Sequence, residues 1–252
     1  MNTNSRTHNV IVNALTNVGG QILTILLSFL TRIVFIKAFG ENYLGINGLF
    51  SNILSVLSLA ELGVSSAIVY CMYKPIAEKN YRQLAALMNY YKKLYRIIGL
   101  IVAVIGLVIV PFLSVLVNIE ADIGNVTVYY LLYLTNTVSS YFLVYKTSIL
   151  TADQKDYIIK LCRVIVAAVQ FVVLTIVAFG LKNYTVYLAL QIGFSILNNV
   201  VCSHIAEKQY PFINDKVELP AEEKKSIWSS ILSMFSYQVG NVILNNTDNI
   251  LI

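Results

Sequence analysis

The sequence predicts an all-α protein, a polytopic bundle of transmembrane helices. Three observations predict this class: 57% of the 252 residues are hydrophobic, only 12% are charged, and the mean hydropathy is +0.70. An ordinary soluble domain carries roughly 25% charged residues, and a soluble globule of this size could not hide so much apolar surface. The composition therefore excludes a disordered chain, a disulfide scaffold and a nucleic-acid-binding domain.

Apolar runs give the elements in order, because a spanning helix needs about 20 mostly apolar residues. Such runs cover residues 9–31, 42–60 (continuing past Glu61 to 73), 97–119, 123–145, 164–181, 183–203 and 226–247. They predict six full spans and a truncated seventh. Since the last run ends almost at residue 252, we expect a fragment or a prematurely ended product.

Lysine and arginine set the expected orientation. With a cytoplasmic N-terminus, all of the 18 lysines and arginines except Arg32, Lys37 and Lys182 fall on the cytoplasmic side. We therefore expect a multi-pass protein of a bacterial cytoplasmic membrane. Six of the basic residues lie within residues 74–96, which we interpret as a topology signal in contact with lipid headgroups rather than as a specific ligand site.

A short internal repeat suggests a domain organisation. The pattern V-G-x-x-I-L occurs at residues 18–23 and again at 239–244, in two spans that both start in the cytoplasm. Many transporters consist of two halves in the same orientation. We expect an amino-terminal six-helix lobe over residues 1–208, a cytoplasmic inter-lobe linker over 209–225, and the start of a second lobe over 226–252.

Polar residues form stripes on the predicted helices. In the first span they recur at steps of three or four, which places them within roughly 100° of the helix wheel. The stripe residues that we expect to line a shared aqueous cavity are Asn13, Asn17, Gln21, Ser28, Arg32, Asn47, Ser51, Ser55, Gln191, Asn198, Gln238, Asn241 and Asn245. Such groups are too costly to face lipid, although hydrogen bonds between packed helices are an alternative for any one of them. The third and fifth spans are almost entirely apolar, and we expect them to face lipid.

Three ionisable residues within the spans are candidate functional groups, because charges in a membrane are costly. Arg32 either reaches the outer interface or anchors an anionic substrate. Glu61 and Asp248 are the candidates for ion coupling, through H⁺ or Na⁺; the alternative for Asp248 is a polar lock between lobes.

The sequence contains no pattern of enzymatic chemistry. It has two histidines and three distant cysteines, with no catalytic triad, paired carboxylates or phosphate-binding glycine loop. We therefore expect neither an enzyme nor a bound cofactor or metal.

Four stretches carry a family resemblance. They are TRIVFIKAFGENYLGINGLF at residues 31–50, AELGVSSAIVY at 60–70, ILTADQKDY at 149–157 and NNTDNILI at 245–252. In their order and spacing they resemble the Wzx-type polysaccharide flippases of the multidrug/oligosaccharidyl-lipid/polysaccharide exporter superfamily. The resemblance covers essentially the whole chain and implies the amino-terminal lobe of a two-lobe exporter fold around a central cavity.

The resemblance also implies a function. Such a protein moves an undecaprenyl-pyrophosphate-linked oligosaccharide across the membrane by alternating access, coupled to H⁺ or Na⁺, during capsule or lipopolysaccharide synthesis. The implied partners are this lipid-linked oligosaccharide, membrane lipids, a carboxy-terminal half and polysaccharide assembly proteins. A multidrug or lipid II exporter of the same superfamily and a non-functional remnant are the alternatives. A membrane-embedded polymerase is disfavoured because the predicted outer loops are short.

Overall fold

The chain folds entirely into helices in the part that the computed structural model describes, residues 3–117 and 124–247. No strand is present within these ranges. The elements are α1 (Thr3–Phe39), α2 (Glu41–Leu57), η1 (Ser58–Glu61), α3 (Leu62–Ala77), α4 (Tyr81–Ile109), η2 (Val110–Phe112), α5 (Leu113–Leu116), α6 (Val126–Leu143), η3 (Val144–Thr147), α7 (Ser148–Ala152), α8 (Asp156–Gly180), α9 (Tyr184–Gln209), η4 (Pro211–Asn214) and α10 (Ala221–Thr247). The all-α prediction is confirmed.

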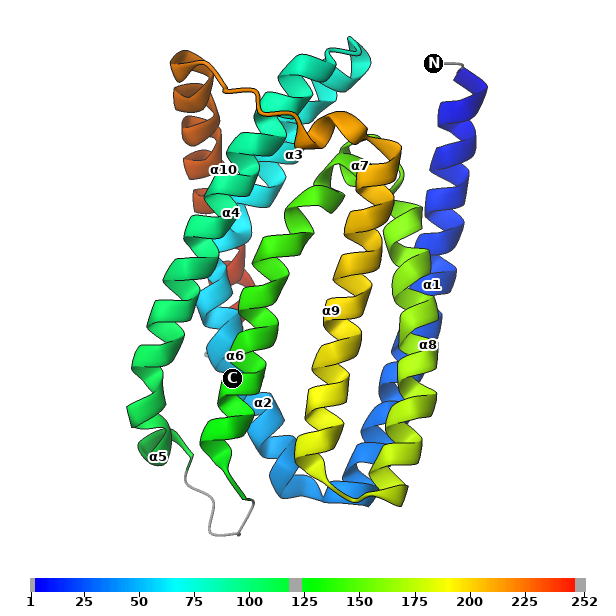
Figure 1. Cartoon of the computed structure of the whole chain (residues 1–252), viewed down its shortest axis with the longest axis vertical. Coiled ribbons are helices and arrows are strands. Elements are labelled where there is room, and N and C mark those ends of the chain that lie inside the picture. Colours follow the sequence, from blue (N-terminus) through cyan, green and yellow to red (C-terminus); the bar gives the residue numbers. More distant parts are fainter. Residues whose placement is uncertain (1–2, 118–123, 248–252) are drawn as a thin grey trace.

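The long helices run side by side along the long axis of the molecule (Figure 1). Neighbouring pairs in contact give the lateral order α4, α6, α9, α8, α1, with α2 and α3 packed behind α4 and α6. The N-terminus, the α3–α4 turn, α7 and η4 lie at one end, and the α1–α2 and α8–α9 turns lie at the other. By the predicted orientation, the end with the N-terminus is cytoplasmic.

Four helical segments are long and apolar enough to cross a membrane: Val18–Phe39, Tyr81–Phe112, Asp156–Gly180 and Tyr184–Gln209. They correspond to the first, third, fifth and sixth predicted spans. The count of six spans and a seventh is not confirmed by these criteria. The second predicted span divides into helices of 17 and 16 residues, and tyrosine, threonine and serine lower the hydropathy of α6.

Helix boundaries differ from the apolar runs because backbone and capping decide where a helix ends. Helix α1 continues to Phe39, where Gly40 adopts a positive φ of 87° and ends it. Helix α10 begins at Ala221, directly after Pro220, within the predicted linker. Asn80, Asn125 and Asn183 cap α4, α6 and α9, each accepting a hydrogen bond from the backbone three residues on.

Apolar side chains cover the outward faces of α4 and α8. The exposed set includes Ile97, Leu100, Ile101, Val104, Ile105, Val108, Ile165, Val169, Val172 and Ile176. An apolar surface of this extent requires contact with lipid or with protein. That these two helices face lipid stays a prediction.

The core is rich in tyrosine. At the end near the α1–α2 turn, Phe35 and Tyr43 pack around Tyr184, whose ring centroid lies 5.9 Å and 4.5 Å from theirs. Nearer the other end, Tyr91 and Tyr95 of α4 pack edge to face, with centroids 4.5 Å apart. The phenol groups of such rings need hydrogen-bond partners when they are buried. Polar side chains are therefore expected beside these tyrosines.

Helix α10 packs against α3 through a glycine contact. A Cβ atom at Gly63 would lie 2.6 Å from the carbonyl oxygen of Ile231 and 2.7 Å from the backbone nitrogen of Phe235. Only glycine permits this approach. The contact places α10 beside α3 and α4, on the side of the bundle away from α1 (Figure 1).

Candidate functional site

Two adjoining cavities form one polar cleft along the bundle, which we call the amide cleft. The first, of about 360 Å³, lies between α6, α8 and α9, and the second, of about 350 Å³, lies between α1, α2, α8 and α9. They share Ala167, Gln170 and Gln191. The polar lining residues are Thr24, Ser28, Thr31, Arg32, Asn47, Tyr133, Asn136, Arg163, Gln170, Tyr187, Gln191, Ser195, Asn198 and Asn199.

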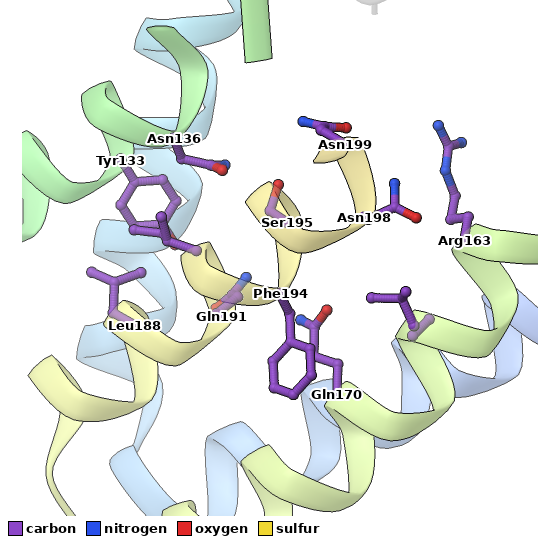
Figure 2. A pocket seen from close by; sticks show the side chains of 13 residues that line it. Tyr133, Asn136, Arg163, Gln170, Leu188, Gln191, Phe194, Ser195, Asn198 and Asn199 are labelled. Carbon is purple, nitrogen blue, oxygen red and sulfur yellow. The ribbon is translucent and has the colours of Figure 1, made fainter. Parts of the chain in front are cut away.

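Amide side chains dominate the first cavity (Figure 2). Gln191, Ser195 and Asn198 project from successive turns of α9, and Gln170 projects from α8. Asn136 of α6 lies across from them, and its side-chain oxygen is buried with no hydrogen-bond partner among the described residues. A buried acceptor of this kind calls for a water molecule or a ligand donor.

The second cavity continues the cleft along α1. The hydroxyls of Thr24 and Thr31 donate to carbonyl oxygens of their own helix, Gly20 and Leu27, each at 2.7 Å. The hydroxyl of Tyr184 donates to the side-chain oxygen of Asn47. These three polar groups are therefore already engaged within the fold, which leaves Ser28 and Arg32 as the groups of α1 best placed to meet a ligand.

An arginine lies toward each end of the amide cleft. Arg163 is near the start of α8, at the end of the bundle that we predict to be cytoplasmic, and Arg32 is near the opposite end of α1. Neither guanidinium forms an ion pair with any residue in the described part of the chain. An unpaired guanidinium beside a polar cavity is suited to bind a carboxylate or a phosphate.

The structure brings together only part of the predicted site. Ser28, Arg32, Asn47, Gln191 and Asn198 line the amide cleft. Gln21, Ser51 and Ser55 are exposed and do not line either cavity, and the Ser55 hydroxyl donates to the carbonyl oxygen of Asn52 at 2.8 Å.

The described side chains of the seventh predicted span do not line the cleft. Gln238 lies on α10, which packs on α3 instead. The side chains of Asn13, Asn17, Asn241 and Asn245 are not among those described, and Asp248 lies outside the described residues.

Sequence reasoning missed the contribution of α8. We expected the fifth span to face lipid, yet one side of it lines the cavity through Arg163 and Gln170. These two residues are seven positions apart and so lie on one helix face. That spacing was the available signal, but a single glutamine in an apolar helix did not distinguish the buried side from the lipid side.

A second polar site surrounds Glu61, where the helix changes to a short 3₁₀ turn between α2 and α3. The hydroxyl of Tyr95 donates a hydrogen bond to the Glu61 carboxylate, and the hydroxyl of Tyr141 donates to the Ser58 hydroxyl at 3.2 Å. Tyr91, Tyr95 and Tyr141 are almost fully buried, while Glu61 is half-buried. We call this group the Glu61 cluster.

No lysine or arginine in the described ranges forms an ion pair with Glu61. The carboxylate, phenol and hydroxyl groups bring several oxygen atoms together here, and oxygen ligands are those that hard cations prefer.

Two of the three cysteines meet across a helix interface. The thiol of Cys162 on α8 interacts with that of Cys202 on α9, which also donates to the Asn198 side-chain oxygen at 4.0 Å. All three cysteines are free thiols. The packing of α8 against α9 brings this pair together although the two residues are distant in the sequence. No group of three or more histidine, cysteine, aspartate or glutamate side chains that could hold a metal occurs within the described residues.

A buried ion pair anchors the loop before α8. Asp153 is 9% exposed; it accepts a hydrogen bond of 2.6 Å from Tyr210 and forms an ion pair of 2.8 Å with Lys155. Burial and the hydrogen bond to Asp153 raise the pKa of the Tyr210 phenol far above its ordinary value. This arrangement ties the α7–α8 loop to the end of α9, as a structural feature of the lobe.

Comparison with protein-family models, with curated proteins and with solved structures finds no match for this chain.

Proposed function

We propose that this chain is the amino-terminal lobe of a flippase that moves a lipid-linked oligosaccharide across a bacterial cytoplasmic membrane by alternating access. The observation that supports this proposal is the amide cleft, with an arginine toward each end. An undecaprenyl-pyrophosphate-linked oligosaccharide has matching chemistry. Its pyrophosphate suits a guanidinium, and its sugar hydroxyls suit amide and serine side chains.

The proposed topology has six crossings and a seventh helix. We assign the crossings to α1, to α2 and α3 together, and to α4, α6, α8 and α9, and we assign α10 to the second lobe. Helices α2 and α3 run consecutively along the bundle, and their combined length from Glu41 to Ala77 exceeds the roughly 20 residues that a crossing needs. Alternating access then requires a second lobe, supplied by a carboxy-terminal half.

The Glu61 cluster is the proposed coupling site for H⁺ or Na⁺. It lies within the bundle on the side of α3 and α4, next to the contact with α10. A change in its charge would therefore act on the boundary between the proposed lobes. The proposal assigns no enzymatic activity to the chain.

Binding of a fluorescent undecaprenyl-pyrophosphate-linked oligosaccharide to the purified chain tests the proposed function. We expect saturable binding, weakened about 3- to 10-fold by Gln191→Leu or Gln170→Leu, because each amide contributes about one hydrogen bond. Thr175→Val is the matched control. The Thr175 hydroxyl bonds to the Phe171 carbonyl oxygen of the same helix and does not line the cleft.

Flipping itself is tested in proteoliposomes, with the chain alone and with a co-expressed carboxy-terminal half. The readout is the fraction of labelled glycolipid that an impermeant reagent can reach. Binding of a lipophilic cationic drug with no binding of the glycolipid would favour the multidrug alternative. Equal movement of phosphatidylcholine would contradict a specific flippase.

A further inference from the structure

Three basic side chains lie within electrostatic range of Lys92, toward the end of the bundle that we predict to be cytoplasmic. Lys92 of α4 interacts electrostatically with Arg96, one turn further along the helix, and with Lys146 and Lys216. We call Lys92, Arg96, Lys146 and Lys216 the basic cluster. It lies outside the amide cleft and is not used in the proposed transport.

The fold assembles the basic cluster by fixing two connecting segments. The side-chain amide of Asn89 donates to the carbonyl oxygens of Asp215 and, at 3.2 Å, of Val217. These two bonds hold the segment that contains Lys216 against α4, one turn before Lys92. Lys146 follows α6 in η3, and its side chain is only 18% exposed.

One carboxylate accompanies these four cations. Glu207 of α9 forms an ion pair of 2.5 Å with Lys146. Among the described residues that interact electrostatically with Lys92, Glu207 is the one acidic group. The group therefore keeps an excess of positive charge, and its like charges repel one another. Lys92 and Lys146 are half-buried, so the repulsion between these two cations is screened less than at an open surface. A negatively charged ligand would relieve it.

The surroundings of the basic cluster point to a lipid ligand. Directly beyond Arg96 on α4, Ile97 and Leu100 are 57% and 63% exposed, and further apolar side chains follow along the same helix. Basic side chains at the end of an exposed apolar helix face suit a phospholipid. Its phosphate would meet the basic side chains, and its acyl chains would lie along the apolar face. The predicted orientation places this end in the leaflet that carries anionic lipids.

We propose that the basic cluster binds the phosphate of an anionic phospholipid of the cytoplasmic leaflet. The acyl chains lie along the apolar face of α4, and the headgroup bridges α4, η3 and the segment before α10. The lipid thereby links the six-helix bundle to the connection that leads to α10. This inference does not depend on the proposed transport function.

The test compares thermal unfolding of the purified chain in detergent with added phosphatidylglycerol, cardiolipin or phosphatidylcholine. A ligand that binds only the folded state raises the unfolding temperature. We expect phosphatidylglycerol and cardiolipin to raise Tm by several degrees above phosphatidylcholine. Lys92→Ala and Lys216→Ala are each expected to remove at least half of that difference. Lys216 is exposed, so its variant keeps the test informative if Lys92→Ala fails to fold.

Lys93→Ala is the matched control, because it removes the same charge from the neighbouring position. Lys93 pairs at 3.8 Å with Glu218 at the exposed surface, where ion pairs contribute little. It should respond to the lipids as the wild type does. An equal loss of the Tm difference in Lys93→Ala would show that the lipids are attracted to the positive surface in general, and it would overturn the proposed binding site. Equal stabilisation by sodium pyrophosphate alone would show a soluble-anion site and overturn the assignment to a lipid.

Discussion

The hydroxyl of Tyr95 donates a hydrogen bond to the carboxylate of Glu61, and it does so from a position with no exposed surface. The two residues come from different helices, and the bond joins the 3₁₀ turn between α2 and α3 to the middle of α4. A carboxylate this deep in a helix bundle depends on such donors, since no cationic partner forms an ion pair with it in the described part of the chain.

Removal of the Tyr95 hydroxyl is expected to destabilise the fold. Tyr95→Phe leaves a half-buried carboxylate without its phenol donor, which should lower the free energy of unfolding by about 1–3 kcal/mol. Denaturant unfolding in detergent measures this change. Tyr73→Phe is the control, because Tyr73 is exposed and should show no comparable loss. Identical stability of the two variants would contradict the importance of the bond.

The contact between α3 and α10 provides a second prediction. Gly63→Ala places a methyl group 2.6 Å from the Ile231 carbonyl oxygen, so α10 must shift. We expect a loss of about 1–3 kcal/mol and a change in the fluorescence of Trp228, the single tryptophan, which lies on α10. Gly193→Ala, in open space within α9, should be neutral or stabilising by up to about 1 kcal/mol. If Gly193→Ala were destabilised while Gly63→Ala were neutral, the close packing of α3 and α10 at Gly63 would be contradicted.

The two arginines of the amide cleft should act in binding rather than in folding. Arg32→Ala and Arg163→Ala are each expected to weaken glycolipid binding about tenfold or more, since each removes a charge-assisted hydrogen bond to phosphate. Membrane insertion and Tm should stay unchanged, because neither arginine forms an ion pair among the described residues. Arg82→Ala removes the same charge at an exposed position that lines neither cavity of the cleft, and it serves as the control. Normal export or binding with Arg32→Ala would refute the anchoring role of Arg32.

Cross-linking can check the packing of α8 against α9. Because the thiols of Cys162 and Cys202 interact across the interface of α8 and α9, oxidation with copper phenanthroline should form a disulfide between them while Cys71 remains available for alkylation. Mass spectrometry of the alkylated peptides distinguishes these products. Cys162→Ser should abolish the cross-link without affecting Cys71. A disulfide that involves Cys71 would contradict the arrangement of these helices.

Stability should depend on Tyr210 at alkaline pH. Its phenol has a pKa raised above the ordinary value of 10.0, by burial and by the hydrogen bond to Asp153. Above pH 10 the folded state therefore keeps a proton that the unfolded state loses. The contribution of Tyr210 to the free energy of unfolding is complete below pH 10, and it is lost as the pH rises from there toward the pKa of the folded state. Unfolding of wild type and Tyr210→Phe at a series of pH values measures this. The variant should be less stable at neutral pH and should lose less stability above pH 10. Parallel curves would contradict the shifted pKa.

Part of the candidate site was predictable and part was not. The stripe Gln191, Ser195 and Asn198 follows from helical spacing alone, and the structure places all three in the amide cleft. For Ser51 and Ser55 the same reasoning failed. They share a helix face with Asn47, yet Asn47 bonds to Tyr184 whereas both serines are exposed. Helical period shows which residues share a face, but not what that face meets.

The sequence by itself determined that this protein is all-α and where four of its long apolar helices lie. Long apolar runs separated by basic segments predict helices in lipid. The reason is that each backbone N–H and C=O group there must form its hydrogen bond within its own segment. The tertiary structure alone decided which helices became neighbours. It joined Gln170 to Gln191, Glu61 to Tyr95, and Lys92 to Lys216, pairs that no spacing along the chain connects. The reason is that the rotation and pairing of helices depend on side-chain packing between distant segments, as at Gly63, whereas helix formation is local.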